Sequence, residues 1–358
     1  MFKYEKEKAH KLRERIGKLP RVHLAYLPTP LEETPRLSKM LKGPQIYFKR
    51  DDLTGLAFGG NKTRMFEFIL GHVLKVGADV VVAGAAVQSN YCRQMAAACS
   101  KLGLDVYLVL RKVRGDIDLQ PQGNFLLDLL TGAHVEIIEA SSPAEQIRIM
   151  EKVTKDLQAK GHHPYLARMA NSEDIGLDAI AYVNCIEEMC EQLENMDLEP
   201  DYLYVASADT TQAGLVLGAK YLRLDFPIVG INPLDKIWGE DVPSTVAKIA
   251  NMAAEILGLD IKVETSEVIS YSDYVGRGYG LVTKEGIKAI ELVAEREGIF
   301  LDPVYTGKAM SALIDHARQG KIGKDKKVIF LHTGGLPALF AYNEEFNVAT
   351  NFCRKIVA

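Results

Sequence analysis

The order of hydrophobic and polar residues alternates between two patterns along the first half of the chain. Short apolar runs predict buried strands, and longer segments with apolar residues three or four positions apart predict amphipathic helices. The short runs are residues 79–83, 106–110 and 134–138. Helical spacing follows residue 62 and occurs again at 91–102 and 124–130. Strands that alternate with helices in this way indicate a parallel sheet covered by helices on both faces.

The second half of the chain repeats this alternation. Apolar runs predict strands at 202–206, 227–231 and 328–331. Helical spacing predicts helices at 213–224, 242–257, 285–297 and 306–319. A chain of 358 residues is too long for one typical core and predicts two domains. We therefore expect a two-domain α/β fold of open parallel sheets covered by helices.

Composition argues against several classes of protein. Hydrophobic residues make up 47% and charged residues 25%, as in an ordinary soluble globular protein. The formal net charge of −4, without a basic stripe, argues against nucleic acid as a partner. No apolar run reaches membrane-spanning length, and the charged N-terminus lacks the apolar core of an export signal, so we expect a cytoplasmic protein. The five cysteines form no CxxC and no metal-ligand spacing with histidine, which indicates reduced thiols and no metal.

Ligands of open α/β sheets bind beyond the carboxyl ends of the strands. Three polar or glycine-rich loops follow predicted strands, at 85–90, 207–212 and 332–335. A further candidate is Gly59-Gly60-Asn61-Lys62, at the start of a predicted helix. A helix start supplies free N–H groups and a positive dipole end, and a lysine there without a carboxylate four residues away is a candidate Schiff-base amine. The alternative interpretation of Lys62 is an ordinary surface lysine.

Six short motifs occur along the chain in one order. They are Lys49-Arg-Asp-Asp52, Gly59-Gly-Asn-Lys62, Gln88-Ser-Asn90, Thr211-Gln-Ala-Gly214, Leu301-Asp-Pro-Val-Tyr305 and His332-Thr-Gly-Gly335. With these motifs the chain resembles, from residue 24 to residue 343, the pyridoxal-phosphate enzymes of the tryptophan synthase β-subunit fold (fold type II). Within that family it resembles the branch of D-cysteine desulfhydrase, 1-aminocyclopropane-1-carboxylate deaminase and L-cysteate sulfo-lyase.

The resemblance implies pyridoxal 5'-phosphate as cofactor, a small amino acid as substrate and a homodimer. It also implies a large cofactor-binding domain of residues 1–55 and 170–358 and a small α/β domain of residues 56–169. Lys62 then takes the role of the lysine that bonds the cofactor aldehyde. Asn61 and Asn90 carry amides able to bond the ring hydroxyl or the imine region, and by analogy Asn90 contacts the cofactor.

Ser89 has two interpretations that are compatible with each other. By analogy its hydroxyl contacts the substrate. A Ser-Asn pair after a strand is also an ordinary helix cap. The free N–H groups at that helix start suit the carboxylate of a substrate.

The loop at 207–211 departs from the family pattern. Relatives have a glycine-rich phosphate cradle of the type Gly-Ser-Gly-Gly-Thr, whereas this chain has Ser207, Ala208, Asp209, Thr210 and Thr211. Backbone N–H groups before the predicted helix at 213 and the two threonine hydroxyls can still hold a phosphate. The carboxylate of Asp209 is repelled by a phosphate dianion unless it points away. We expect phosphate binding here, with a geometry that the motif does not define.

Two tyrosines and two threonines complete the candidate site. By resemblance Tyr279 and Tyr305 lie at the substrate, where a phenol whose pKa the cofactor lowers can move a proton; the alternative is a tyrosine packed in a core. The deaminase pattern has a glutamate at Thr306 and a leucine at Thr333. Neutral threonines near the pyridine nitrogen make a weaker electron sink, which suffices when a thiolate or sulfite leaves from Cβ.

The sequence therefore predicts a pyridoxal-phosphate-dependent lyase that carries out β-elimination. D-cysteine, giving pyruvate, sulfide and ammonia, is the first substrate we expect. L-cysteate, giving sulfite instead, is the alternative, with Arg168 or Arg277 as the cation for its sulfonate; ring opening of aminocyclopropane carboxylate ranks below both. Two further alternatives are a relative that has lost turnover and a nucleotide-binding α/β protein, against which the absence of GxxxxGK[ST] and GxGxxG argues.

Overall fold

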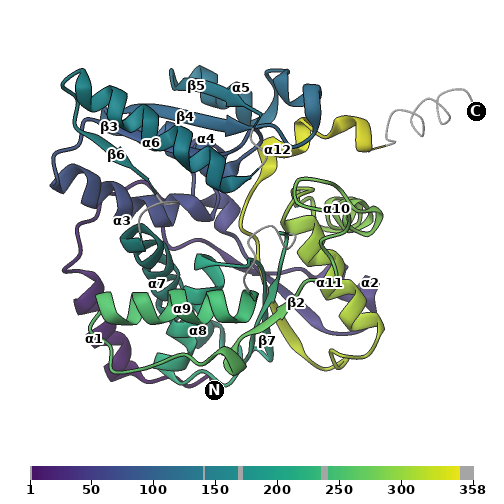
Figure 1. The fold of residues 1–358 in the computed structure, drawn as a ribbon. Helices are drawn as coiled ribbons and strands as arrows, with labels where there is room; N and C mark the ends of the chain where they lie inside the picture. Colours follow the sequence, from purple (N-terminus) through teal and green to yellow (C-terminus); the bar gives the residue numbers. More distant parts are fainter. Residues whose placement is uncertain (1, 140–141, 168–171, 235–240, 347–358) are drawn as a thin grey trace, which may run out of the picture.

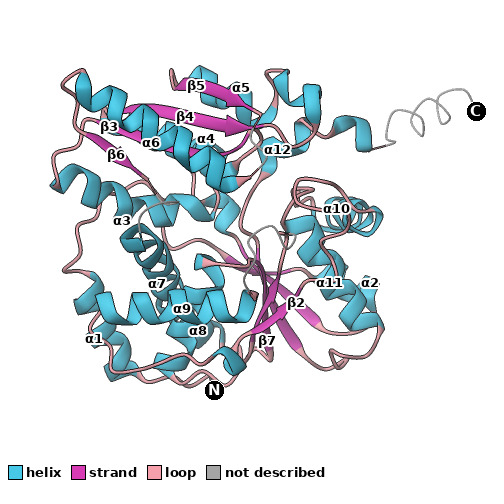
Figure 2. Ribbon diagram, viewed as in Figure 1, coloured by secondary structure: helices cyan, strands magenta, loops and turns pink. Residues whose placement is uncertain are grey.

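The computed structural model describes residues 2–139, 142–167, 172–234 and 241–346. Its strands form two separate sheets, each enclosed by helices (Figures 1 and 2). The four-stranded sheet has the order β5-β4-β3-β6. Its strands are β3 (Val80–Ala86), β4 (Asp105–Arg111), β5 (His134–Ile138) and β6 (Pro164–Leu166). All pairs in this sheet are parallel, so the carboxyl ends of its strands share one edge.

The six-stranded sheet has the order β1-β2-β10-β7-β8-β9. Its strands are β1 (Leu31–Glu33), β2 (Gln45–Lys49), β7 (Tyr202–Ala206), β8 (Ile228–Ile231), β9 (Ile269–Tyr271) and β10 (Lys327–Leu331). The short β1 is antiparallel to β2, and the other pairs are parallel. Both sheets thus confirm the expected fold of parallel sheets covered by helices.

Three of the four hydrophobic clusters among the described residues fill the space between sheets and helices. The largest is continuous from the small sheet to the large one, and includes residues of α3 (Asn61–Lys75), α4 (Asn90–Leu102), α7 (Ser172–Met196), α8 (Thr210–Leu222) and α9 (Val242–Ile256). A second packs α2 (Pro35–Leu41), α10 (Lys284–Glu297) and α11 (Thr306–Arg318) on the opposite face of the large sheet. The third packs α6 (Pro143–Ala159) on the outer face of the small sheet.

Other helices lie at the periphery. They are α1 (Lys6–Ile16), α5 (Gly123–Leu130) and α12 (Leu336–Phe340). In Figure 1 the chain runs from the large sheet up to α12, which packs against α5 beside the small sheet. None of the described helices is long and apolar enough to cross a membrane.

Most predicted elements agree with the structure to within a residue or two, and one boundary matters for function. The helix predicted to start at Ala213 starts at Thr210, so half of the predicted polar loop is the first turn of α8. The reason is local, because the hydroxyl of Ser207 accepts hydrogen bonds from the N–H groups of Asp209 (3.3 Å) and Gln212 (3.1 Å) and thereby caps the early turn. The domain boundaries at residues 55–56 and 169–170 stay a prediction.

Candidate active site

Asn61 joins the loop before Lys62 to two of the other candidate loops. Its backbone N–H donates to the carbonyl of Thr333 over 3.0 Å, and its side-chain Nδ2 donates to the hydroxyl of Thr211 over 3.1 Å. Asn61 is buried, so both bonds are shielded from water. The loops at 59–62, 207–212 and 332–335, which are far apart in the sequence, therefore meet at the start of α3.

Glycine is required where these loops touch. A Cβ on Gly334 would lie 2.6 Å from the Cα of Gly60, closer than any real side chain is tolerated. Both glycines have positive φ angles, +90° and +130°. The backbones of the two loops are therefore in direct contact, and this contact fixes the position of the loop that leads into Lys62.

Arg93 of α4 holds the strained loop that precedes Lys62. Ala57 and Phe58 have left-handed φ angles of 46° and 68°, which are unfavourable for residues with side chains. The guanidinium of Arg93 donates to the carbonyls of Ala57 and Gly59, the latter over 3.1 Å. Arg93 is fully buried, and this desolvation lowers its pKa to about 10. A buried cation thus ties the loop to the helix that starts at Asn90.

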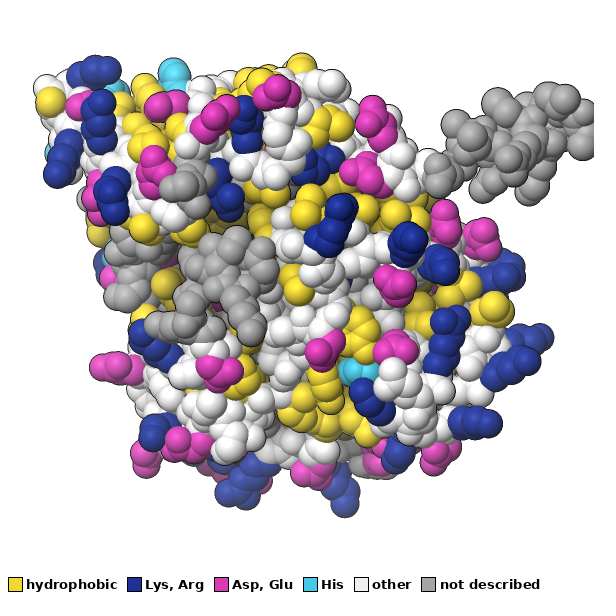
Figure 3. Space-filling view, turned by 45° about the vertical axis from the view of Figure 1, so that its right-hand side comes forward, with side chains coloured by type: hydrophobic (Ala, Val, Ile, Leu, Met, Phe, Trp, Pro, Cys, Tyr) yellow, Lys and Arg dark blue, Asp and Glu magenta, His cyan; other side chains and the backbone are white. Residues whose placement is uncertain are grey.

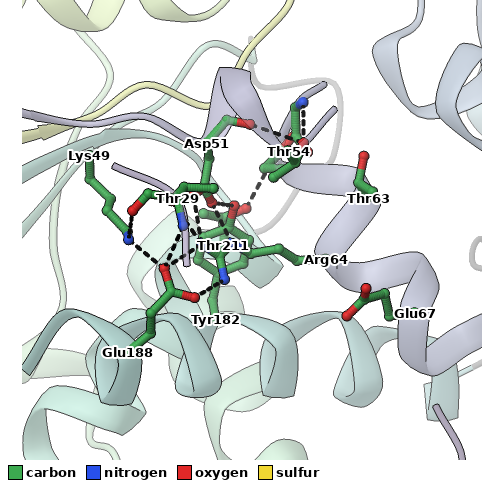
Figure 4. Close-up of polar contacts among 12 residues, drawn as sticks. Thr29, Lys49, Asp51, Thr54, Thr63, Arg64, Glu67, Tyr182, Glu188 and Thr211 are labelled. Atoms are coloured by element: carbon green, nitrogen blue, oxygen red, sulfur yellow. Dashed lines mark hydrogen bonds and ion pairs between the residues drawn. The ribbon is translucent and has the colours of Figure 1, made fainter. Parts of the chain in front are cut away.

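A buried ion network anchors the other end of the same segment (Figure 4). Arg64, two residues after Lys62, donates to both oxygens of Asp51 over 2.9 Å and to Glu188 of α7 over 2.8 and 2.9 Å. Tyr182 donates to Asp51 over 2.6 Å. Lys49 donates to Glu188 and, over 2.8 Å, to the carbonyl of Thr29. Lys49 and Asp51 of the first motif therefore hold the lysine helix in place.

The electrostatics of this network favour the charged forms. Burial alone would raise the pKa of the Asp51 carboxyl, but the guanidinium of Arg64 outweighs it and holds the pKa below its usual value. The pKa of Glu188 is lowered in the same way, since burial is again outweighed by its hydrogen bond to Arg64. The segment carrying Lys62 is thus held by buried ion pairs that persist at neutral pH.

Ser89 and Asn90 lie at the start of α4, on the edge where the strands of the small sheet end. The hydroxyl of Ser89 accepts from the N–H groups of Tyr91 (3.1 Å) and Cys92 (3.2 Å), so Ser89 is a helix cap. The side-chain oxygen of Asn90 accepts from Asn124 over 2.9 Å. Gln94, fully buried, accepts from the N–H and hydroxyl of Thr63 over 2.9 Å and so links the starts of α3 and α4.

In the loop at 207–211, at the N-terminus of α8, one hydroxyl makes no hydrogen bond to the described protein. Ser207 is occupied by the cap described above, and Thr211 accepts from Asn61. The hydroxyl of Thr210 is buried and has no hydrogen-bond partner in the described structure. A buried hydroxyl without a partner at the N-terminus of a thirteen-residue helix suits an anion that the protein does not itself supply. Ala208 is buried beside it, and Asp209 lies close enough to raise the pKa of Tyr305.

Tyr279 and Tyr305 come from distant segments and touch through their hydroxyls, which lie 2.8 Å apart. Burial is the main cause that raises the pKa of both phenols, most strongly that of Tyr305. The protein environment therefore raises the pKa of both phenols, whereas the sequence led us to expect a lowered pKa. Both phenols stay protonated at neutral pH, so they can donate a proton.

Two residues outside the predicted site position these tyrosines. Asp302 accepts from the N–H groups of Val304 (2.9 Å), Tyr305 (3.0 Å) and Thr306 (2.8 Å) and so caps α11. Lys308, buried in the next turn, donates to the carbonyls of Val275 (2.8 Å) and Gly278 (3.2 Å), next to Tyr279.

The hydroxyl of Thr306 makes its hydrogen bonds within the same turn. Its hydroxyl donates to the Asp302 carboxylate and accepts from the Asp302 N–H, both over 2.7 Å. The Thr306 hydroxyl therefore already has hydrogen-bond partners without the pyridine nitrogen of a cofactor. Thr333 accepts a hydrogen bond from the N–H of Asn61 through its backbone carbonyl.

Sequence reasoning missed Arg93, Gln94, Asp302 and Lys308. Only Asp302 had a signal, because it lies within the Leu301-Asp-Pro-Val-Tyr305 motif, just before the start of α11. Of the two arginines predicted to bind a sulfonate, Arg277 is exposed and Arg168 lies outside the described residues.

Comparison with known proteins identifies the family. Residues 22–334 match the model of the pyridoxal-phosphate dependent enzymes. The chain belongs to this family. A protein of Serratia proteamaculans named D-cysteine desulfhydrase is 38% identical over 340 residues, 93% of this chain and 99% of its own length. A protein of Pyrococcus abyssi with the provisional name 1-aminocyclopropane-1-carboxylate deaminase is 38% identical over 331 residues, 92% of this chain and 96% of its own.

Solved structures agree with this assignment. The crystal structure of an ACC deaminase homologue superposes with a TM-score of 0.84 at 37% identity, covering 94% of this chain and 98% of that one. A pyridoxal 5'-phosphate-dependent aspartate racemase shares the fold, with a TM-score of 0.62 at 19% identity. This pyridoxal-phosphate-dependent enzyme thus has the fold and cofactor that its sequence predicted.

The residues at the meeting point of the loops fit the cofactor. The start of α8 offers N–H groups and the unpartnered hydroxyl of Thr210 to a phosphate. Lys62 offers an amine at the start of α3, and Asn90 an amide at the start of α4. These three helix starts belong to segments held together by Asn61 and Gln94.

Proposed function

We propose that this enzyme is a lyase that eliminates a sulfur substituent from Cβ of a small amino acid. The first substrate is D-cysteine, which gives pyruvate, sulfide and ammonia. The names of relatives 38% identical to the chain support this reaction class. The observation that carries it is the Tyr279–Tyr305 pair, because two protonated phenols 2.8 Å apart form a proton donor suited to a departing thiolate.

The other residues of the candidate site bind the cofactor and the substrate. We propose that Lys62 bonds the cofactor, that Asn61 and Asn90 orient its ring, and that residues 207–211 hold its phosphate with the Thr210 hydroxyl as one donor. When bound, the cofactor supplies the electron sink that makes the α-hydrogen of the amino acid acidic. The hydroxyl of Ser89, which accepts from the N–H groups of Tyr91 and Cys92, donates its own proton to the substrate carboxylate, and the amine of Lys62 takes the α-proton.

Elimination is favoured over ring opening because the threonine positions carry no charge. Neither Thr306 nor Thr333 can hold a proton on the ring nitrogen as a carboxylate does, and Thr306 already bonds Asp302. A weaker electron sink is sufficient when the Cβ–S bond breaks as the α-proton leaves.

A panel of substrates tests this proposal. Pyruvate with sulfide is expected from D-cysteine, and pyruvate with sulfite from L-cysteate. L-cysteine and aminocyclopropane carboxylate complete the panel. Formation of 2-oxobutyrate from aminocyclopropane carboxylate at the rate of pyruvate from D-cysteine would contradict elimination, and so would the absence of pyruvate from every sulfur substrate.

We also propose that the enzyme acts in the cytoplasm as a homodimer. Its described cysteines are free and buried, as expected in a reducing compartment. Exposed apolar side chains gather on α5, with Leu126, Leu129 and Leu130 at 40%, 43% and 72% exposure, and suit a second copy of the chain. On the face in Figure 3, acidic and basic side chains are interspersed, which gives no continuous basic surface for nucleic acid. Light scattering should give twice the monomer mass, and Leu126→Asp with Leu130→Asp should reduce it.

A further inference from the structure

Arg111 is the last residue of β4 and lies beside the loop that carries Ser89. Its Cα pairs with that of Ala86 at the end of β3, and its carbonyl accepts from the N–H of Val87 over 3.0 Å. Because both strands are parallel, Arg111 lies at the sheet edge where the candidate site is built. It was not among the residues that the sequence singled out.

The half-buried side chain of Arg111 lacks the partners that Arg64, Arg93 and Arg114 have. Arg64, Arg93 and Arg114 each bond carboxylates or carbonyls of the protein. The guanidinium of Arg111 makes no hydrogen bond or ion pair within the described residues, and its Nε is buried without a partner. A buried N–H donor without a partner is unfavourable, so the Nε of Arg111 leaves a position for an external acceptor beside it.

The charge of the guanidinium reaches the phenol of Tyr279. Its positive charge opposes the burial that raises the pKa of the Tyr279 phenol. Tyr279 belongs to the loop held by Lys308, whereas Arg111 belongs to the small sheet. The two side chains thus approach from different parts of the chain, and in the proposed reaction Tyr279 serves the leaving group.

We propose that Arg111, whose Nε is unpartnered at the end of β4 beside the Ser89 loop, binds a sulfonate on Cβ of the substrate, so that the enzyme accepts amino acids with a β-sulfonate as well as D-cysteine. This inference rests on the proposed β-elimination and extends its range of substrates. A guanidinium forms two parallel hydrogen bonds with such an oxyanion. The substrate α-carboxylate is assigned to the Ser89 hydroxyl at the start of α4, so Arg111 remains for the other end of the molecule.

The leaving-group chemistry selects a sulfonate. In elimination from a β-sulfonate the Cβ–S bond breaks, its electron pair leaves with sulfur as sulfite, and the α-proton passes to the amine of Lys62. One water then completes hydrolysis to pyruvate and ammonia, with no oxidant or reductant. A β-carboxylate would also pair with Arg111, but it cannot leave with the bonding electrons.

Binding of an unreactive analogue tests Arg111 without turnover. 3-Sulfopropanoate has both anionic ends but no amine, and propanoate lacks the sulfonate. By calorimetry on the holoenzyme, Arg111→Gln should weaken 3-sulfopropanoate binding about tenfold to a hundredfold. It should leave propanoate binding within about twofold. Arg36→Gln, an exposed arginine on α2, is the matched control and should change neither.

Kinetics separate this inference from the proposed function. Arg111→Gln should lower kcat/KM for L-cysteate about tenfold to a hundredfold and for D-cysteine less than about threefold. Equal loss for both ligands or both substrates, or a loss in Arg277→Gln instead, would overturn the role of Arg111. If the wild type eliminates from no sulfur substrate, the proposed function fails, while the 3-sulfopropanoate titration still decides whether Arg111 binds the sulfonate.

Discussion

The side-chain amide of Asn61 donates a hydrogen bond to the hydroxyl of Thr211, 150 residues further along the chain, over 3.1 Å. This bond joins the segment that carries Lys62 to the first turn of α8, where we propose that the cofactor phosphate lies. It connects the two ends of the cofactor site through the protein itself.

The Asn61–Thr211 bond should contribute to cofactor retention. Asn61→Ala and Thr211→Val should each weaken cofactor affinity, by about 1 kcal/mol or roughly fivefold. In the double variant the losses should not add, because both substitutions remove the same bond. Visible absorbance during dialysis measures the retained cofactor, and full additivity would contradict the coupling.

Lys62 should be the only lysine attached to the cofactor. Borohydride reduction followed by peptide mapping should find the label there. Lys49 and Lys308 are the fairest competitors, since both are buried, but each is already held by protein oxygens. A label on either would refute the assignment.

Replacing Arg93 should destabilise the loop before Lys62. Arg93→Met leaves the carbonyls of Ala57 and Gly59 without this donor. We expect a loss of about 1–3 kcal/mol in the free energy of unfolding, measured with urea. An unchanged free energy of unfolding would show that Arg93 does not hold this loop.

The Asp51–Arg64 pair predicts acid sensitivity. The pKa of Asp51 is lowered on folding from its ordinary 3.8, so its stabilisation is complete above that pH and is lost as the pH falls through the folded-state pKa. The free energy of unfolding should therefore fall steeply below about pH 4. Asp51→Asn should be less stable at pH 7 and lose less between pH 4 and pH 2, where urea midpoints give the comparison. Parallel pH curves would exclude this role.

The tyrosine pair should act as an acid. Tyr279→Phe should lower kcat for D-cysteine about a hundredfold or more. Because the pKa of Tyr279 is raised above its ordinary 10.0, the wild-type rate should show no loss below pH 10 from its ionisation. Tyr47→Phe, on β2, is the matched control. A rate loss near pH 8 that disappears in Tyr279→Phe would show that the phenol ionises in the working range.

The sequence by itself determined the elements whose signal is local. The strands at 134–138 and 202–206 were predicted with the bounds that the structure has, because short runs rich in β-branched and aromatic residues favour strands. The ordered motifs likewise determined the family and Lys62 as the candidate for the cofactor lysine. Ser89 could be predicted as a cap for the same reason, since its partners are two and three residues away.

Only the tertiary structure decided which polar residues face one another. Arg93 and Lys308 looked like ordinary helix residues, and their roles depend on carbonyls of loops distant in sequence or strained in conformation. Helix α8 starts at Thr210 and not at the predicted Ala213, because the Ser207 hydroxyl accepts a hydrogen bond from the N–H of Gln212. Arg111 belongs to no motif, and only the folded structure shows that its Nε is buried without a hydrogen-bond partner. Such relationships arise from long-range packing, which no local pattern of residues encodes.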